Sequence, residues 1–321
     1  MKYIDMHCDT ITKLYESNGN LRNNDLHIDI NKLKKGECLL QNFAVFTNLA
    51  KHDSKFTKAS IDYYYSQMEL NKDAIRPINK FKDIEDNNNL GLISAMLTLE
   101  EGSIIDGDLD NLDLYYDLGV RMITLTWNYP TIIGYPNIDL SIKHNNDPTY
   151  TFNDRDGLTD FGIEFVRRCN QKGIIVDVSH LSDKGFYDVV NYCDKPFVAS
   201  HSNARSVCRS GRNLTDDMIV KLASKGGVTG VNFCAAFVDN DEVKYTSIEN
   251  TVKQIKHIVN VGGIECIGIG TDFDGICSIL EIENASNMQL LYAALKKYYS
   301  DEDIEKVFYK NVLRVYKDNL Q

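Results

Sequence analysis

The chain has 321 residues, of which 43% are apolar and 25% charged, the balance of a globular protein with a sizeable core. This length suits one large α/β barrel or two ordinary domains. The formal net charge of −11 argues against a general nucleic-acid-binding surface, which would be basic, but it leaves acidic substrates open because a metal site can reverse the local potential.

The N-terminus and the cysteines indicate a cytoplasmic protein. Met1 leads directly into strand-like sequence, without the basic region and long apolar core of a signal peptide. No stretch approaches the roughly 18 consecutive apolar residues of a transmembrane helix, so we expect no membrane partner. The eight cysteines are scattered without a C-x-x-C pair, which favours free thiols in a reducing compartment over a disulfide framework.

The first part of the chain alternates short apolar strands with segments of helical spacing. The helix predicted at about 57–76 carries an apolar and aromatic stripe and stops before Pro77, because proline cannot continue a helix. In order, we predict a strand at 3–8, a helix near 28–35, a strand at 38–46, the helix at 57–76, a turn at Asn87-Asn88-Asn89, a strand at 90–99, a helix at 109–118 and a strand at 120–126.

About 30 residues then follow without a helical or strand pattern. This segment, 127–157, is rich in Asn, Asp, Pro, Tyr and Gly, and a loop of that length inside a compact domain is usually a lid or a binding element. The alternation then resumes with predicted helices at 158–171, 182–193, 215–225 and 247–260, strands at 173–180, 196–201, 227–233 and 264–270, and two closing helices near 286–299 and 301–316.

Eight short strands that alternate with helices predict a parallel sheet with helical cover. Most of the strands are apolar on both faces, as strands buried beneath helices must be. Eight such units in a chain of this size favour a (β/α)₈ TIM barrel formed by residues 1–321 as a single domain, with the 127–157 loop as a possible lid. A doubly wound open sheet is the alternative.

Metal-ligand residue types gather where the predicted strands end, and in a barrel those ends form the active site. Three of the seven histidines lie there; for the other four, His27, His52, His144 and His257, we expect solvated positions. Each strand-end residue alone has an ordinary explanation, such as a backbone-satisfied histidine or a turn-capping Asp. Together they predict ligands for two divalent ions, with Zn²⁺ preferred and Mn²⁺, Co²⁺ or Fe²⁺ open, because the set mixes nitrogen and oxygen without thiolate. The set is His7 and Asp9, Glu100 or Glu101, His180, His201 and Asp272.

Six stretches, in order along nearly the whole chain, resemble the membrane (renal-type) dipeptidases of the metal-dependent amidohydrolase superfamily. They are Asp5-Met6-His7-Cys8-Asp9, Leu99-Glu100-Glu101-Gly102, Ile175-Val176-Asp177-Val178-Ser179-His180, Ser200-His201-Ser202-Asn203-Ala204-Arg205-Ser206-Val207-Cys208, Gly211-Arg212-Asn213-Leu214-Thr215-Asp216-Asp217 and Gly270-Thr271-Asp272-Phe273-Asp274-Gly275.

The resemblance implies a role for each residue of a barrel with two zinc ions. His7 and Asp9 would hold one metal, His180 and His201 the other, and Glu100 would bridge them. Asp272 would be the catalytic acid and base. Arg212 would bind the C-terminal carboxylate of the substrate, a task that suits a planar and always charged guanidinium.

One position departs from the family. Similar proteins often carry, just after the fourth strand, a histidine that contacts the oxyanion of the tetrahedral intermediate. In Thr124-Leu125-Thr126-Trp127-Asn128-Tyr129 this place is taken by Trp127, the only tryptophan, which can donate a hydrogen bond but cannot be cationic. Three explanations are open. Trp127 or Asn128 takes the place of this histidine in binding substrate, His144 reaches into the site from the long loop, or the substrate range has shifted.

By this resemblance, the predicted function is a zinc-dependent dipeptidase. A metal-bridging hydroxide would attack the scissile carbonyl of a small peptide, and a D-residue at the C-terminal position would be tolerated. The alternatives are another binuclear amidohydrolase, acting on N-acyl-amino acids, lactones or phosphoesters, and a non-catalytic metal-binding or interaction protein. A homodimer is a possible assembly.

Overall fold

Eight parallel strands close into a barrel in the computed structural model, which describes residues 1–142, 151–241 and 244–321. The neighbours run β2-β1-β10-β8-β7-β6-β5-β4, and the β2–β4 pairing closes the ring, so the (β/α)₈ prediction is confirmed and the open-sheet alternative is wrong. The strands are β1 (Tyr3–Asp5), β2 (Cys38–Phe46), β4 (Ile93–Glu100), β5 (Val120–Thr124), β6 (Ile175–Asp177), β7 (Val198–Ala199), β8 (Val228–Val231) and β10 (Ile267–Ile269).

Several strands are shorter than predicted because polar residues leave the ladder where the functional edge begins. The strand predicted at 196–201 is reduced to Val198–Ala199. The next backbone N–H, that of Ser200, donates to the Asp177 carboxylate at 2.8 Å instead of to a strand carbonyl. Side chains therefore replace the regular ladder at this end of the barrel.

The predicted helix at 57–76 is wrong beyond Leu70. Helix α3 spans Ser54–Leu70, and the short strand β3 (Ile75–Pro77) then pairs in parallel with β4. Tertiary pairing with β4 thus overrides the local helical spacing. The Asn87-Asn88-Asn89 run is not a separate turn but the last turn of α4 (Phe81–Asn89), and α1 (Thr10–Ser17) was not predicted.

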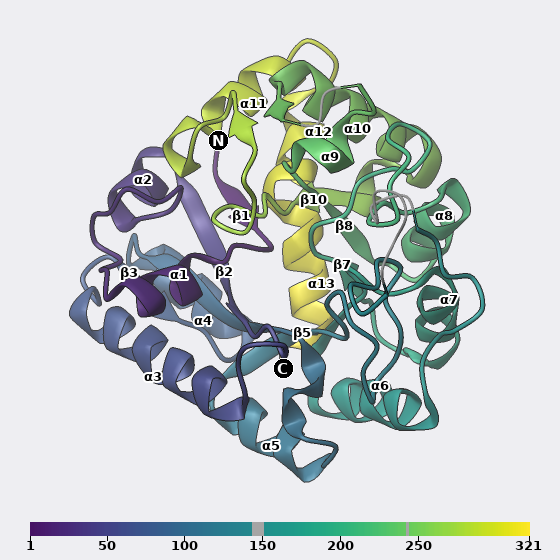
Figure 1. Cartoon of the computed structure of the whole chain (residues 1–321). Coiled ribbons are helices and arrows are strands. Elements are labelled where there is room, and N and C mark those ends of the chain that lie inside the picture. Colours follow the sequence, from purple (N-terminus) through teal and green to yellow (C-terminus); the bar gives the residue numbers. More distant parts are fainter. Residues whose placement is uncertain (143–150, 242–243) are drawn as a thin grey trace.

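The helices lie around the outside of the strand ring (Figure 1). Four helices in the second half of the chain begin at a Ser or Thr whose side chain accepts a hydrogen bond from a first-turn N–H, as an N-cap should: Thr159, Ser182, Thr215 and Ser247. The remaining outer elements are α2 (Ile30–Lys35), α5 (Asp110–Asp117), α6 (Asp160–Lys172), α7 (Asp183–Tyr192), α8 (Asp216–Ser224), α9 (Ala235–Val238), β9 (Tyr245–Thr246), α10 (Ile248–Gly262), β11 (Ile279–Leu280) and α11 (Gln289–Leu295).

The final helix packs against the interior of the barrel instead of its outer face. The helix predicted at 301–316 is divided into α12 (Asp301–Glu305), a π-helical turn (Lys306–Lys310) and α13 (Asn311–Asn319). Figure 1 shows α13, in yellow, crossing the middle of the strand ring. Val312, Val315 and Tyr316 share one buried cluster with inward-facing residues of β1, β2, β4, β5, β6, β7 and β8. Helix α13 therefore forms a floor beneath the interior of the barrel.

The described parts of the long loop are anchored to the neighbouring strand-to-helix connection. The buried Asn137 donates its backbone N–H to the His180 carbonyl and its side-chain amide to Asp183. Pro136 forms a bridge with Leu181. The lid role of 127–157 stays a prediction, and His144 lies outside the described residues.

All eight cysteines lie in the described part of the chain, and each is a free thiol. Among the described helices, none combines the length and the apolar character needed to cross a bilayer.

Candidate active site and metal centre

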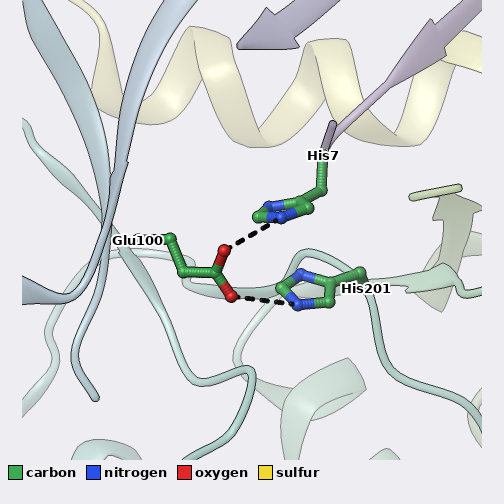
Figure 2. A group of neighbouring side chains, drawn as sticks. All are labelled: His7, Glu100 and His201. Atoms are coloured by element: carbon green, nitrogen blue, oxygen red, sulfur yellow. Dashed lines mark ion pairs between the residues drawn. The ribbon is translucent and has the colours of Figure 1, made fainter. Parts of the chain in front are cut away.

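Glu100 lies at the centre of the predicted ligand set, and its two carboxylate oxygens face different histidines. Oε2 lies 3.4 Å from His7 Nε2, and Oε1 lies 3.0 Å from His180 Nε2 and 3.7 Å from His201 Nε2. Figure 2 shows this carboxylate between His7 and His201. The neighbouring Glu101 turns away, and its carboxylate oxygens accept hydrogen bonds from the backbone N–H groups of Ser103 and Trp127. The last residue of β4 is thus the one that faces the histidines.

His7 and Asp9 follow β1 and reach the same point. His7 Nε2 lies 3.6 Å from Asp9 Oδ2. Ligand atoms of His7, Glu100 and His201 lie within 4.8 Å of one another, as do those of His7, Asp9 and Asp272. Within the described residues, both ring nitrogens of His7 and Oδ1 of Asp9 are buried without a hydrogen-bond partner. Buried polar atoms with no partner are costly, so this donor set fits a bound divalent cation.

His180 and His201 complete the set from the ends of β6 and β7. Their Nε2 atoms lie 3.2 Å apart, and each Nδ1 contacts an oxygen: Asn128 Oδ1 at 2.9 Å for His180, and Ser200 Oγ at 2.7 Å for His201. His180 has a φ of +71°, an uncommon value for a residue with a side chain. The backbone thus adopts a left-handed conformation at a predicted ligand residue.

Asp272 follows β10 and is held beside the first pair of ligands. Its Oδ2 accepts a hydrogen bond from Asn232 Nδ2 at 2.8 Å, and its φ is +62°. Gly275 lies against the carboxylates of Asp272 and Asp9, where a Cβ atom would overlap an oxygen of each. The glycine leaves the space that the two acidic side chains need.

Burial and crowding shift the pKa values of this cluster in opposite directions. Burial and the nearby Glu100 raise the pKa of Asp9 to about 6. Burial, with Asp9 and Glu100, raises the pKa of Asp272 to about 7. Burial and the Arg212 charge lower the pKa of His180 to about 4, which keeps its imidazole neutral and able to bind a metal at neutral pH.

A cavity of about 430 Å³ opens onto this centre. Asp9, Glu100, His180 and Asp272 line it, together with the aromatic side chains of Phe46, Trp127 and Phe237. The Trp127 ring packs edge-on against Phe46, with centroids 4.9 Å apart. Asn128 also lines the cavity, and within the described residues its Nδ2 makes no hydrogen bond.

Arg212 is a buried cation without a carboxylate partner among the described residues. The residue is only 3% exposed, and its Nη atoms make long contacts, 3.4 Å to Ser202 Oγ and 3.3 Å to the His201 carbonyl oxygen. The guanidinium carbon lies 5.6 Å from the ring centroid of Phe237, which lines the large cavity. Arg212 itself lines a smaller neighbouring cavity that shares His180. A buried charge in this position is poised to receive an anion.

Several contributing residues were not predicted. Ser200, Asp177 and Asn232 contact the candidate ligands or one another, and each lies at or just after a strand end. Ser200 and Asn232 were missed because the strand-end signal was applied only to metal-ligand residue types, and Asp177 because the strand was predicted to continue to 180. His52 was expected to be solvated but stacks on Phe56 and lines the cavity. The other two described histidines outside the cluster make local contacts: His27 with Asp274 and His257 with Asp216.

Comparison with known proteins gives a consistent result. The family model described as membrane dipeptidase (peptidase family M19) matches residues 1–321. An uncharacterized dipeptidase of Schizosaccharomyces pombe is 30% identical, with 91% of this chain and 72% of that protein covered. A Klebsiella pneumoniae protein encoded in the region 5′ of pqqA is 31% identical, with 71% and 82% covered.

Solved structures match over the full length. A dipeptidase of family M19 superposes with a TM-score of 0.90 at 24% identity, with 100% of this chain and 99% of that chain covered. A metallopeptidase from Rhodobacter sphaeroides, liganded with a phosphinate mimic of L-Ala-D-Ala, also gives 0.90, at 23% identity with 99% of each chain covered.

Proposed function

The chain belongs to the membrane dipeptidase family, peptidase family M19, and from that premise we propose that it is a binuclear zinc dipeptidase. Its substrates would be dipeptides, including those with a D-residue at the C-terminal position, the stereochemistry of the mimic bound by the Rhodobacter sphaeroides metallopeptidase. The observation that carries the proposal is the division of the two Glu100 oxygens between His7 on one side and His180 and His201 on the other.

In this proposal His7 and Asp9 would hold one ion, His180 and His201 would hold the second, and Glu100 would be shared between them. Three imidazole nitrogens and two carboxylates favour Zn²⁺, and Mn²⁺, Co²⁺ and Fe²⁺ can use the same donors. When bound, two such ions would supply Lewis acidity, which lowers the pKa of a coordinated water and polarises a carbonyl.

Asp272 supplies the proton transfers. Its carboxylate lies in the ligand cluster beside Asp9 and is oriented by Asn232, so it can accept a proton from the attacking water and return it to the leaving amine nitrogen. Its pKa of about 7 suits a group that must both accept and donate a proton near neutral pH.

Arg212 and the cavity wall position the substrate. The buried guanidinium would pair with the free C-terminal carboxylate, which restricts substrates to short peptides. Trp127 provides an apolar surface, and Asn128 Nδ2 is the neutral donor that remains available to a substrate oxygen where the family often has a histidine.

Replacing Arg212 tests this function. For Arg212→Met we expect KM to rise at least about 100-fold for dipeptides, from the loss of a charge-assisted pair, and to change little for the matching dipeptide amides, which lack the carboxylate. Arg212→Lys serves as the control, because it keeps the positive charge but loses the planar guanidinium that can donate two parallel hydrogen bonds to a carboxylate. An equal response of acids and amides would contradict the assignment.

The parent enzyme is assayed on a wider panel in parallel, with metal content measured by elemental analysis. L,L- and L,D-dipeptides are compared with N-acyl-amino acids, lactones and phosphoesters. Hydrolysis of one of the latter classes in preference to every dipeptide would replace the proposed substrate with that class.

A further inference from the structure

The two halves of the ligand set differ in how firmly the protein holds them. We propose that the His180/His201 half binds its metal first and most tightly, and that the His7/Asp9 half loads second and exchanges its metal readily. This inference rests on the proposed binuclear centre and concerns the order and strength of metal loading within it.

In the first half, hydrogen bonds fix both imidazoles. Asn128 Oδ1 lies 2.9 Å from His180 Nδ1, and since an amide oxygen can only accept, the proton belongs on Nδ1 and the lone pair on Nε2. Ser200 Oγ lies 2.7 Å from His201 Nδ1 and orders that ring in the same way. Both Nε2 atoms then point toward Glu100 Oε1, at 3.0 and 3.7 Å.

A second layer of contacts holds these orienting groups. The Ser200 hydroxyl donates to Asp177 Oδ2 at 2.6 Å, which leaves its lone pairs for His201. Asp177 also accepts from Thr124 Oγ1 at 2.7 Å and from the N–H groups of Ser179 and Ser200 at 3.0 and 2.8 Å. The ring of His201 is therefore tied to β5, β6 and β7 before any metal arrives.

The second half lacks this support. Within the described residues neither ring nitrogen of His7 has a hydrogen-bond partner, and Asp9 Oδ1 has none either. The His7 ring stacks on His201, with centroids 3.8 Å apart and an interplanar angle of 27°. Stacking does not select which nitrogen carries the proton. A metal that binds here must fix the tautomer of His7 and the rotamer of Asp9, which costs part of the binding free energy.

Stepwise titration of metal-free protein with Zn²⁺ against a chromophoric chelator tests the proposal. We expect two steps that differ at least tenfold in affinity. Asp9→Asn should weaken or abolish the weaker step and leave the tighter one unchanged, and His180→Ala should abolish the tighter one.

Asn128 provides the finer test. Asn128→Ala should weaken the tighter step by about 10- to 100-fold, the usual effect of removing a partner of a metal-ligating histidine. Asn128→Asp keeps an acceptor oxygen beside His180 Nδ1 and should therefore retain the affinity of the tighter step. Asn191→Ala, on the exposed surface of α7, is the control for an ordinary Asn-to-Ala change. Unfolding curves of each metal-free variant show whether the fold is retained.

The outcomes separate this inference from the proposed function. Two steps of equal affinity, loss of the tighter step in Asp9→Asn, or an unchanged tighter step in Asn128→Ala would each overturn the inference while the binuclear centre stands. Failure of the parent protein to bind two zinc ions would overturn the centre and the inference with it.

Discussion

Asp272, the proposed catalytic acid and base, also carries a cost in stability. Its pKa is raised to about 7 because the carboxyl is buried beside Asp9 and Glu100. The folded state therefore binds this proton more tightly than the unfolded chain, whose carboxyl titrates near 4. Protonation of Asp272 therefore favours the folded state. This contribution to the free energy of unfolding is complete below the pKa of the unfolded chain and is lost as pH rises through the pKa of the folded protein.

Asp272→Asn should separate the two effects. Turnover should fall about 10² to 10⁴-fold with metal content unchanged, because the acid and base is lost. The metal-free variant should be more stable than the parent at pH 8 by on the order of 2 kcal/mol, and by much less at pH 4, where Asp272 is already protonated. Thermal unfolding of chelator-treated protein at the two pH values measures this. If the variant were as active as the parent, the assigned catalytic role would be refuted. If it were stabilised equally at both pH values, the raised pKa would be refuted.

At the residue scale, the sequence was informative wherever chemistry depends on residue type and strand position. His7, Asp9, His180 and His201 could be selected because ligand residue types recur at several strand ends, although each alone has an ordinary explanation. Glu100 was preferred to Glu101 through the family resemblance. The contact that Asn128 makes could not be deduced, because an amide side chain beside the site can face either the substrate or a neighbouring histidine. Only the 2.9 Å contact with His180 reveals what its oxygen does.

At the scale of elements, one buried carboxylate holds three neighbouring strands. Asp177 ends β6 and accepts hydrogen bonds from Thr124, which ends β5, and from Ser200, which follows β7. Asp5 plays a comparable part on the other side of the ring, where it accepts the N–H and hydroxyl hydrogen bonds of Thr271 after β10. These carboxylates connect adjacent strand ends that backbone pairing leaves open.

Asp177→Ala should therefore destabilise the whole barrel. The change leaves two backbone N–H groups and two hydroxyls without their acceptor in a buried position, and we expect the free energy of unfolding to fall by about 3 kcal/mol or more. Asp117→Ala, at an exposed position at the end of α5, should change it by less than about 0.5 kcal/mol. Urea denaturation monitored by circular dichroism measures both. A loss for Asp177→Ala no larger than that of the control would show that the contacts are dispensable.

The strands were predictable at this scale because burial on both faces leaves continuous apolar runs, and the eight predicted runs all contain barrel strands. The elements that were missed have weak local signals. β3 has three residues and depends on its pairing with β4, and α4 ends in three asparagines that usually favour turns. Contacts with distant residues decide such cases.

At the scale of the whole molecule, α13 completes the barrel core. Tyr316 is fully buried, and its hydroxyl exchanges hydrogen bonds with the Asn42 side chain on β2, 2.8 Å from Nδ2 and 3.0 Å from Oδ1. The sequence predicts a helix here, but it carries no sign that this helix closes the barrel interior, because its apolar face would suit an outer helix equally well.

Two substitutions of Tyr316 separate packing from hydrogen bonding. Tyr316→Phe leaves the buried Asn42 amide short of a partner and should cost about 1 to 3 kcal/mol. Tyr316→Ala also opens a cavity and should cost about 3 to 5 kcal/mol. Tyr298→Phe, at an exposed tyrosine, is the control. If both Tyr316 variants unfold at the same denaturant concentration as the parent, α13 is not part of the cooperative core.

The position of this floor has a consequence for synthesis on the ribosome. α13 follows β1 by about 300 residues, so at about 5 to 20 residues per second it emerges on the order of 15 to 60 seconds later. The first strands are made early in that time, whereas β10 precedes α13 by only about 40 residues. The apolar inner side chains of the early strands therefore lack a cover for most of the interval. We therefore expect the early strands to be prone to aggregation until β10 closes the ring and α13 covers its interior.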